Sequence, residues 1–86
     1  MTPEQVKAKF PWATQREQYP WEYRLQLYSQ PAYRQYAIQD LIYTKAVAED
    51  RARQGLPFTD QQDWATKIRM AAGLPDYLYG PGVTSD

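Results

Sequence analysis

The stretch PAYRQYAIQDLIYTKAVAEDRARQGLP, residues 31–57, decides the fold of this chain. Pro31 presets the backbone of a first helical turn, where its missing N–H costs nothing. At the other end, Gly55 suits the left-handed residue that commonly ends a helix, and Pro57 prevents the helix from continuing. The stretch therefore predicts a long helix over about 31–54.

Apolar side chains cover an unusually wide arc of this predicted helix. At about 100° per residue, eight apolar residues between Tyr33 and Ala52 span half a turn, and Ile38 and Ile42 extend the arc. A helix packed against one small domain usually has a narrower stripe. Either its own neighbours cover two sides, or a partner covers one. We favour the partner, which makes Ile38 and Ile42 candidate contact residues.

Asp40 lies inside this apolar arc. A lone carboxylate there would be costly unless it accepted hydrogen bonds. We expect tyrosine hydroxyls, or an arginine from the N-terminal segment, to supply them. A cation from a partner and a catalytic acid are the alternatives.

A second main helix is predicted over about 60–72. Thr59 with Gln62 resembles a capping box at its start, and Gly73 begins a stop signal of the same type as the one after the long helix. Its apolar residues form a single stripe, through which the helix should pack internally. They are Trp64, Ala65, Ile68, Ala71 and Ala72.

Two shorter helices are predicted near 3–9 and 20–29. Thr2 and Gln5 have the spacing of a capping box for the first. In the second, apolar and polar residues alternate from Trp21 onward, which is typical of a strand. A single strand cannot satisfy its own backbone groups, so we favour a helix. If the segment is a strand, it should pair with another chain.

These elements predict an all-α fold, a small irregular helical domain spanning 1–86. We divide it into an aromatic and proline-rich arm (1–30), a helical hairpin (31–75) and a tail (76–86). Extended proline-rich connections should join the helices.

The composition argues against catalysis. The chain has no histidine and no cysteine, so it lacks the usual general base and the usual zinc and iron–sulfur ligands. Asp60 and Asp63 could suggest a metal site, but their place in a first helical turn explains them. We therefore expect no enzyme activity, no metal and no cofactor.

The chain also lacks a membrane-spanning run, and Glu4, Lys7 and Lys9 argue against a signal peptide. Small secreted domains often need disulfides, so we expect a soluble, intracellular protein.

Aromatic crowding is the main functional signal, because nine of thirteen aromatic residues lie between Phe10 and Tyr43. A chain of 86 residues buries only about 60–65% of its unfolded surface, so some rings should meet another molecule. Tryptophan, tyrosine and arginine are enriched in protein-interface hot spots. They also stack on single-stranded nucleic acid, but ten basic and ten acidic residues give no net charge. The expected partner-binding residues are Phe10, Trp12, Tyr19, Trp21, Tyr23, Arg24, Ile38 and Ile42.

We therefore predict a non-catalytic interaction protein, a structural, accessory or adaptor subunit of a larger assembly such as a virion or a multi-protein complex. The alternatives are a reversible inhibitor of one enzyme and, less favoured, a single-stranded nucleic-acid binder. Replacing Trp64 with alanine should unfold the chain. The same change at Trp12 or Trp21 should mainly weaken association.

Overall fold

The computed structural model describes residues 2–9, 11–12 and 18–75. Every longer element among these residues is a helix, which confirms the predicted all-α fold. Phe10 and the predicted tail over 76–86 lie outside the described residues. The elements, in chain order, are α1 (Pro3–Lys9), α2 (Trp21–Tyr28), the 3-10 helix η2 (Pro31–Tyr33), α3 (Arg34–Arg53) and α4 (Thr59–Ala72).

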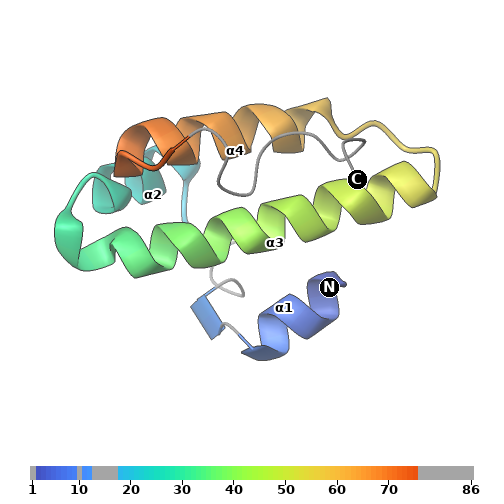
Figure 1. The fold of residues 1–86 in the computed structure, drawn as a ribbon, viewed down its shortest axis with the longest axis horizontal. Helices are drawn as coiled ribbons and strands as arrows, with labels where there is room; N and C mark the ends of the chain where they lie inside the picture. The colour runs from blue at the N-terminus through green and yellow to red at the C-terminus, as the bar shows by residue number, and fades with distance from the viewer. Residues whose placement is uncertain (1, 10, 13–17, 76–86) are drawn as a thin grey trace.

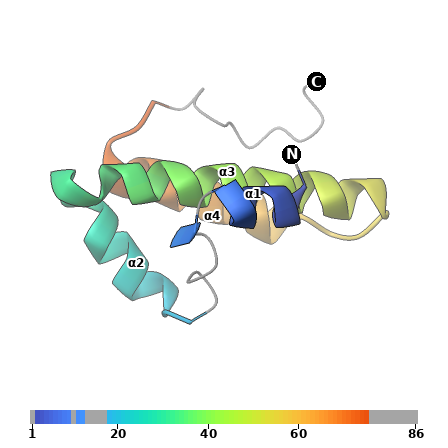
Figure 2. The same cartoon turned by 90° about the horizontal axis from the view of Figure 1, so that it is seen from below.

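Helix α3 runs through the middle of the molecule, and the other helices pack around it (Figure 1). Helix α4 returns antiparallel along one side of α3, while α1 lies along another side. Helix α2 packs where α3 begins, and Figure 2 shows its axis turned away from that of α3. Among the described residues, no helix is both long and apolar enough to cross a membrane.

The predicted stop signals end both main helices. Gly55 and Gly73 have positive φ angles of 71° and 65°, the left-handed conformation that glycine adopts without steric cost. The amide of Leu56 donates to the carbonyl oxygen of Arg51, and the amide of Leu74 donates to that of Arg69, both at 2.9 Å. This bond satisfies a carbonyl that would otherwise lack an intrahelical partner.

Both main helices begin differently from the prediction. Pro31–Tyr33 forms a 3-10 turn, and Tyr33 has φ −106° and ψ 7°, so α3 starts only at Arg34. Helix α4 starts at Thr59, after Phe58 with φ −136° and ψ 9°, and no side chain caps it. The capping box predicted at Thr59 is wrong, because this residue already belongs to the helix.

Helix α1 covers a second side of α3. Its predicted capping box is confirmed: the Thr2 amide donates to Gln5 Oε1 at 2.8 Å, and the Gln5 amide donates to Thr2 Oγ1 at 3.2 Å. Val6 of α1 is fully buried against Tyr43 and Ala46 of α3. The capping box thus stabilises the start of the short helix, and Val6 packs the helix against α3, where Lys7 also lies over the Tyr43 ring.

The expectation that the Ile38–Ile42 side of α3 lacks intramolecular cover is wrong. Ile42 packs beside the cluster formed with α1, and Ile38 packs against the main core; both are half-buried. The neighbours of α3 thus account for its wide apolar arc, because Val6 of α1 packs on the side of α3 that faces away from α4.

The main core lies between α2, α3 and α4. Tyr28, Leu41 and Ile68 are nearly or fully buried in it, and Trp12 and Trp64 pack against its edge. The predicted internal packing of α4 through Trp64 and Ile68 is confirmed. The strand alternative for α2 is wrong, because its helix satisfies its own backbone and directs Arg24 and Tyr28 to the same buried side.

Candidate functional site

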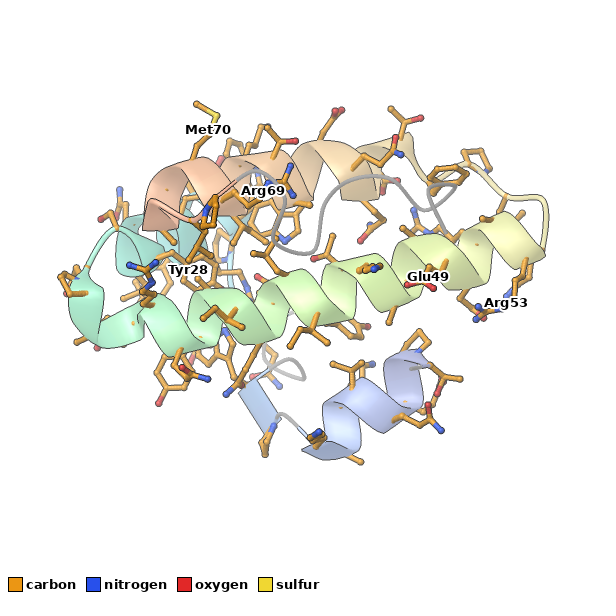
Figure 3. All side chains as sticks on the ribbon, viewed as in Figure 1. Tyr28, Glu49, Arg53, Arg69 and Met70 are labelled. Atoms are coloured by element: carbon orange, nitrogen blue, oxygen red, sulfur yellow. The ribbon has the colours of Figure 1, made fainter. Side chains whose placement is uncertain are left out.

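A buried polar network joins α2, α3 and α4. Asp40 of α3 is fully buried and accepts hydrogen bonds at Oδ2 from Arg24 Nη1 at 3.0 Å and from the Tyr28 hydroxyl at 2.7 Å. Its Oδ1 accepts from the indole N–H of Trp64 at 3.2 Å. The Tyr28 hydroxyl accepts in turn from Arg24 Nη1 at 2.9 Å and from the indole N–H of Trp12 at 3.0 Å. The carboxylate of α3 thus orients side chains from α2 and α4, among them Tyr28 (Figure 3).

The network explains how Asp40 is tolerated in an apolar arc. The hydrogen bonds expected from a tyrosine hydroxyl and an N-terminal arginine are both present. Burial, together with the adjacent Asp40 carboxylate, raises the pKa of Tyr28 above its ordinary value of 10.0. The hydroxyl therefore stays protonated at neutral pH and remains a donor to the carboxylate.

Arg24 is not a surface residue, so its assignment to the partner-binding set is corrected. Its side chain is only 1% exposed, and its charge is satisfied by Asp40. The guanidinium also lies over the ring of Trp12, 5.0 Å from its centroid. A buried carboxylate requires a buried cation, and the (i, i+4) spacing of Arg24 and Tyr28 places both opposite it.

Three predicted contact residues do lie on the surface. Tyr19, Trp21 and Tyr23 are exposed by 42%, 48% and 46%, at or just before the N-terminus of α2. Tyr23 lies on a different side of the helix from the buried Arg24 and Tyr28, whereas Trp21 shares their side at the start of the helix and Tyr19 precedes it. The polar network therefore holds in place a helix whose N-terminal end presents three partly exposed aromatic rings.

A continuous run of aromatic ring contacts, one stacked and three tilted, extends from this helix to the start of α3. Tyr23 and Tyr19 have centroids 5.5 Å apart, and Tyr19 stacks on Trp12 at 6.3 Å with 16° between planes. Trp12 meets Tyr36 at 4.9 Å, and Tyr36 meets Tyr33 at 5.8 Å. We call these five residues the aromatic ladder. Such contacts contribute about 0.5–1.5 kcal/mol per pair beyond buried area and fix ring orientations.

Trp12 has two roles in this arrangement. It is the central ring of the aromatic ladder, and it also packs on the core and donates to Tyr28. The expectation that losing Trp12 would mainly weaken association therefore needs correction, because the same change removes core contacts. Tyr36, which is 38% exposed, is a ladder residue that the sequence-based set missed. Its (i, i+3) spacing from Tyr33 was the available signal.

A surface pocket of about 370 Å³ lies between the start of α2 and helix α4. Trp21 and Trp64 form two of its walls and meet edge to face, with centroids 6.4 Å apart and planes at 90°. Lys67 of α4 places its Nζ atom 4.6 Å from the centroid of the Trp21 ring. The described residues that line it are Tyr19, Trp21, Arg24, Asp60, Gln61, Asp63, Trp64 and Lys67.

Asp60 at the rim of this pocket belongs to an ion pair that ties α3 to α4. Arg51 Nη1 donates to both carboxylate oxygens, at 2.7 and 2.9 Å. Desolvation opposes ionisation of this carboxyl, but the hydrogen bonds from Arg51 and Gln61 outweigh it and lower its pKa. Asp60 is well exposed and Arg51 is partly exposed, so solvent screens the pair and it contributes little to stability.

Helix α4 also buries a second arginine. Arg69 is 4% exposed, and its Nη2 atom donates to Thr66 Oγ1 at 3.2 Å. Its Nε and Nη1 atoms have no acceptor among the described residues. Met70, the next residue, points away from the molecule and is 77% exposed (Figure 3). A buried guanidinium with unused donors is destabilising unless an acceptor reaches it.

The described residues contain no cluster of three or more side chains of the metal-ligating types His, Cys, Asp and Glu. The chemistry available at this surface is aromatic stacking, cation binding and hydrogen bonding. A comparison with known protein families, with curated proteins and with solved structures finds no match to this chain.

Proposed function

We propose that this chain is a non-catalytic interaction protein that binds another protein through the aromatic ladder and Trp21. One observation carries the proposal. Three large aromatic side chains, Tyr19, Trp21 and Tyr23, are exposed by 42–48% at or just before the N-terminus of α2, the helix that the buried Arg24–Asp40 pair holds in place. Rings with fixed orientation lose little conformational entropy on binding, which favours their use as interface anchors.

A protein partner fits this surface better than a nucleic acid. Stacking proteins that bind single strands combine exposed rings with a positive groove. Here Arg24, which follows the exposed rings in sequence, is buried and paired with Asp40. The pocket beside Trp21 carries Asp63, an exposed carboxylate whose charge would repel phosphate.

We further propose that the chain serves as a structural or accessory subunit of a larger assembly, of the kind found in virions and multi-protein complexes. Its lack of cysteine and its small size favour an intracellular setting, because small secreted domains usually rely on disulfides. These finer assignments rest on composition.

The test compares partner capture by the full-length tagged chain and two variants. Tyr23→Ala removes an exposed ladder ring, and Leu56→Ala removes an apolar side chain of similar exposure, 49%, at the far turn between α3 and α4. Loss of an interface anchor costs about 2 kcal/mol or more, close to a thirtyfold loss of affinity.

Co-purified proteins are quantified by mass spectrometry, and stoichiometry is measured on the purified assembly. We expect one partner at fixed ratio, retained by Leu56→Ala and lost with Tyr23→Ala. Equal recovery by both variants would overturn the assignment of this surface. Recovery at variable, substoichiometric ratio would replace the subunit role with that of a reversible regulator.

A further inference from the structure

The pocket between α2 and α4 already holds a cation of the chain's own. Lys67 Nζ lies 4.6 Å from the centroid of Trp21, the geometry of a cation–π contact. Trp64 closes the adjacent wall edge to face, so two indole rings border the place where this ammonium lies. The volume of about 370 Å³ lies within the range of small-ligand sites.

The charges around the pocket leave one carboxylate available. Arg24 is neutralised by Asp40 beneath the pocket, and Asp60 is held by both hydrogen bonds from Arg51. Asp63 is exposed and forms no ion pair with any residue in the described part of the chain, Lys67 included. Among the described residues, the lining thus combines indole rings, which attract cations, with a carboxylate that forms no ion pair.

We propose that this pocket binds an arginine side chain of the protein partner, and that Lys67 occupies the cation position until the partner arrives. The inference rests on the proposed function, because the arginine belongs to the bound protein. It assigns the chemistry of one contact within that interface.

A guanidinium suits the pocket better than the ammonium that Lys67 provides. Its planar group stacks on an indole face while its N–H groups form two parallel hydrogen bonds to a carboxylate. An ammonium is a compact charge that makes no such paired contact. Lys67 is exposed on α4, so its side chain can leave the ring without disturbing the core.

The test uses NMR titration of the full chain with acetyl-Gly-Arg-Gly-amide. The chain has three indole N–H groups, which report separately on Trp12, Trp21 and Trp64. We expect saturable shifts for Trp21 and Trp64, the two pocket tryptophans, and smaller shifts for Trp12. The neutral citrulline peptide should produce no saturable shift, and the lysine peptide should bind more weakly than the arginine peptide.

Two pocket variants separate a cation site from an anion site. Asp63→Asn should weaken arginine-peptide binding by about two- to fivefold, the effect of losing an exposed ion pair. Lys67→Gln should strengthen it by a similar factor of about two to five, because it removes the competing cation. Asp50→Asn, on α3 outside the pocket, is the matched control and should leave binding unchanged.

Several results would overturn the inference. Equal binding of the citrulline peptide would show that charge plays no part. Binding of acetyl-Gly-Glu-Gly-amide that is lost in Lys67→Gln would make Lys67 an anion receptor. The proposed function is tested separately through Tyr23, which does not line the pocket. If the arginine peptide fails to bind while Tyr23→Ala still abolishes partner capture, only the pocket assignment falls.

Discussion

Replacing Asp40 with asparagine tests whether one buried carboxylate holds the three helices together. Oδ2 accepts from both Arg24 and Tyr28, and Oδ1 accepts from Trp64. An asparagine keeps the shape but supplies one carbonyl oxygen and one NH2 group. Whichever way the amide is turned, a buried donor faces another donor, and the charge of Arg24 loses its partner.

The expected cost of Asp40→Asn is large. Leaving one member of a buried ion pair without its partner costs about 3–5 kcal/mol. Domains of 86 residues have a total stability of about 4–13 kcal/mol, so the variant should lose a large part of its stability. With a urea slope of about 1–1.5 kcal/mol/M, the unfolding midpoint should fall by roughly 2 M or more.

The assay is urea unfolding followed by circular dichroism and tryptophan fluorescence. Asp50→Asn is the matched control on the same helix, because the Asp50 carboxylate meets Arg53 at 3.2 Å on the surface. It should change stability by less than about 1 kcal/mol. The double variant Arg24→Met with Asp40→Asn should cost less than the sum of the two single changes, by about 1 kcal/mol or more.

The reasoning fails if Asp40→Asn is no more destabilising than Asp50→Asn. Strict additivity in the Arg24 and Asp40 cycle would also contradict it, because independent side chains show no coupling. A variant that is destabilised but keeps its partner binding would still support the network as a structural device.

Three further outcomes are expected. Because the fold raises the pKa of Tyr28 above 10.0, the protonated hydroxyl contributes its full stabilisation below about pH 10, and this stabilisation is lost as the pH rises above that value. Tyr28→Phe should therefore remove the alkaline fall in the free energy of unfolding when stability is measured as a function of pH. Gly73→Ala should destabilise by about 1–2 kcal/mol in urea, because φ is 65° and nothing lies within 4 Å to compensate or clash. Arg69→Met should be neutral or stabilising in the same urea assay, because it removes two buried donors that have no acceptor among the described residues. A loss of stability as large as that of Arg24→Met would show instead that Arg69 is paired.

Local signals in the sequence predicted the helices well. The glycine stops at Gly55 and Gly73 and the capping box at Thr2 depend on neighbouring residues alone, and all three are present. The box predicted at Thr59 failed because the helix begins one residue earlier, after Phe58. A shift of one residue moves a hydroxyl from the cap position into the first turn, and sequence patterns do not resolve helix ends that finely.

The candidate site was harder to predict, because surface and core residues share one aromatic segment. Tyr19, Trp21 and Tyr23 are exposed as expected, whereas Arg24 points inward. In an eight-residue helix with little amphipathic pattern, the buried side depends on which residue meets Asp40. That choice depends on charge pairing between segments sixteen residues apart, which periodicity does not report.

Sequence alone determined that this chain forms helices, where the two main helices end, and that Asp40 needs buried donors. These properties follow from local backbone preferences and from the cost of isolating a charge. Tertiary structure alone decided that α1 covers the Ile42 side of α3, that Trp12 belongs to both core and ladder, and that Trp21, Trp64 and Lys67 share one pocket. Each of these depends on how distant segments compete to bury surface and pair charges, and that competition is settled only when the helices pack.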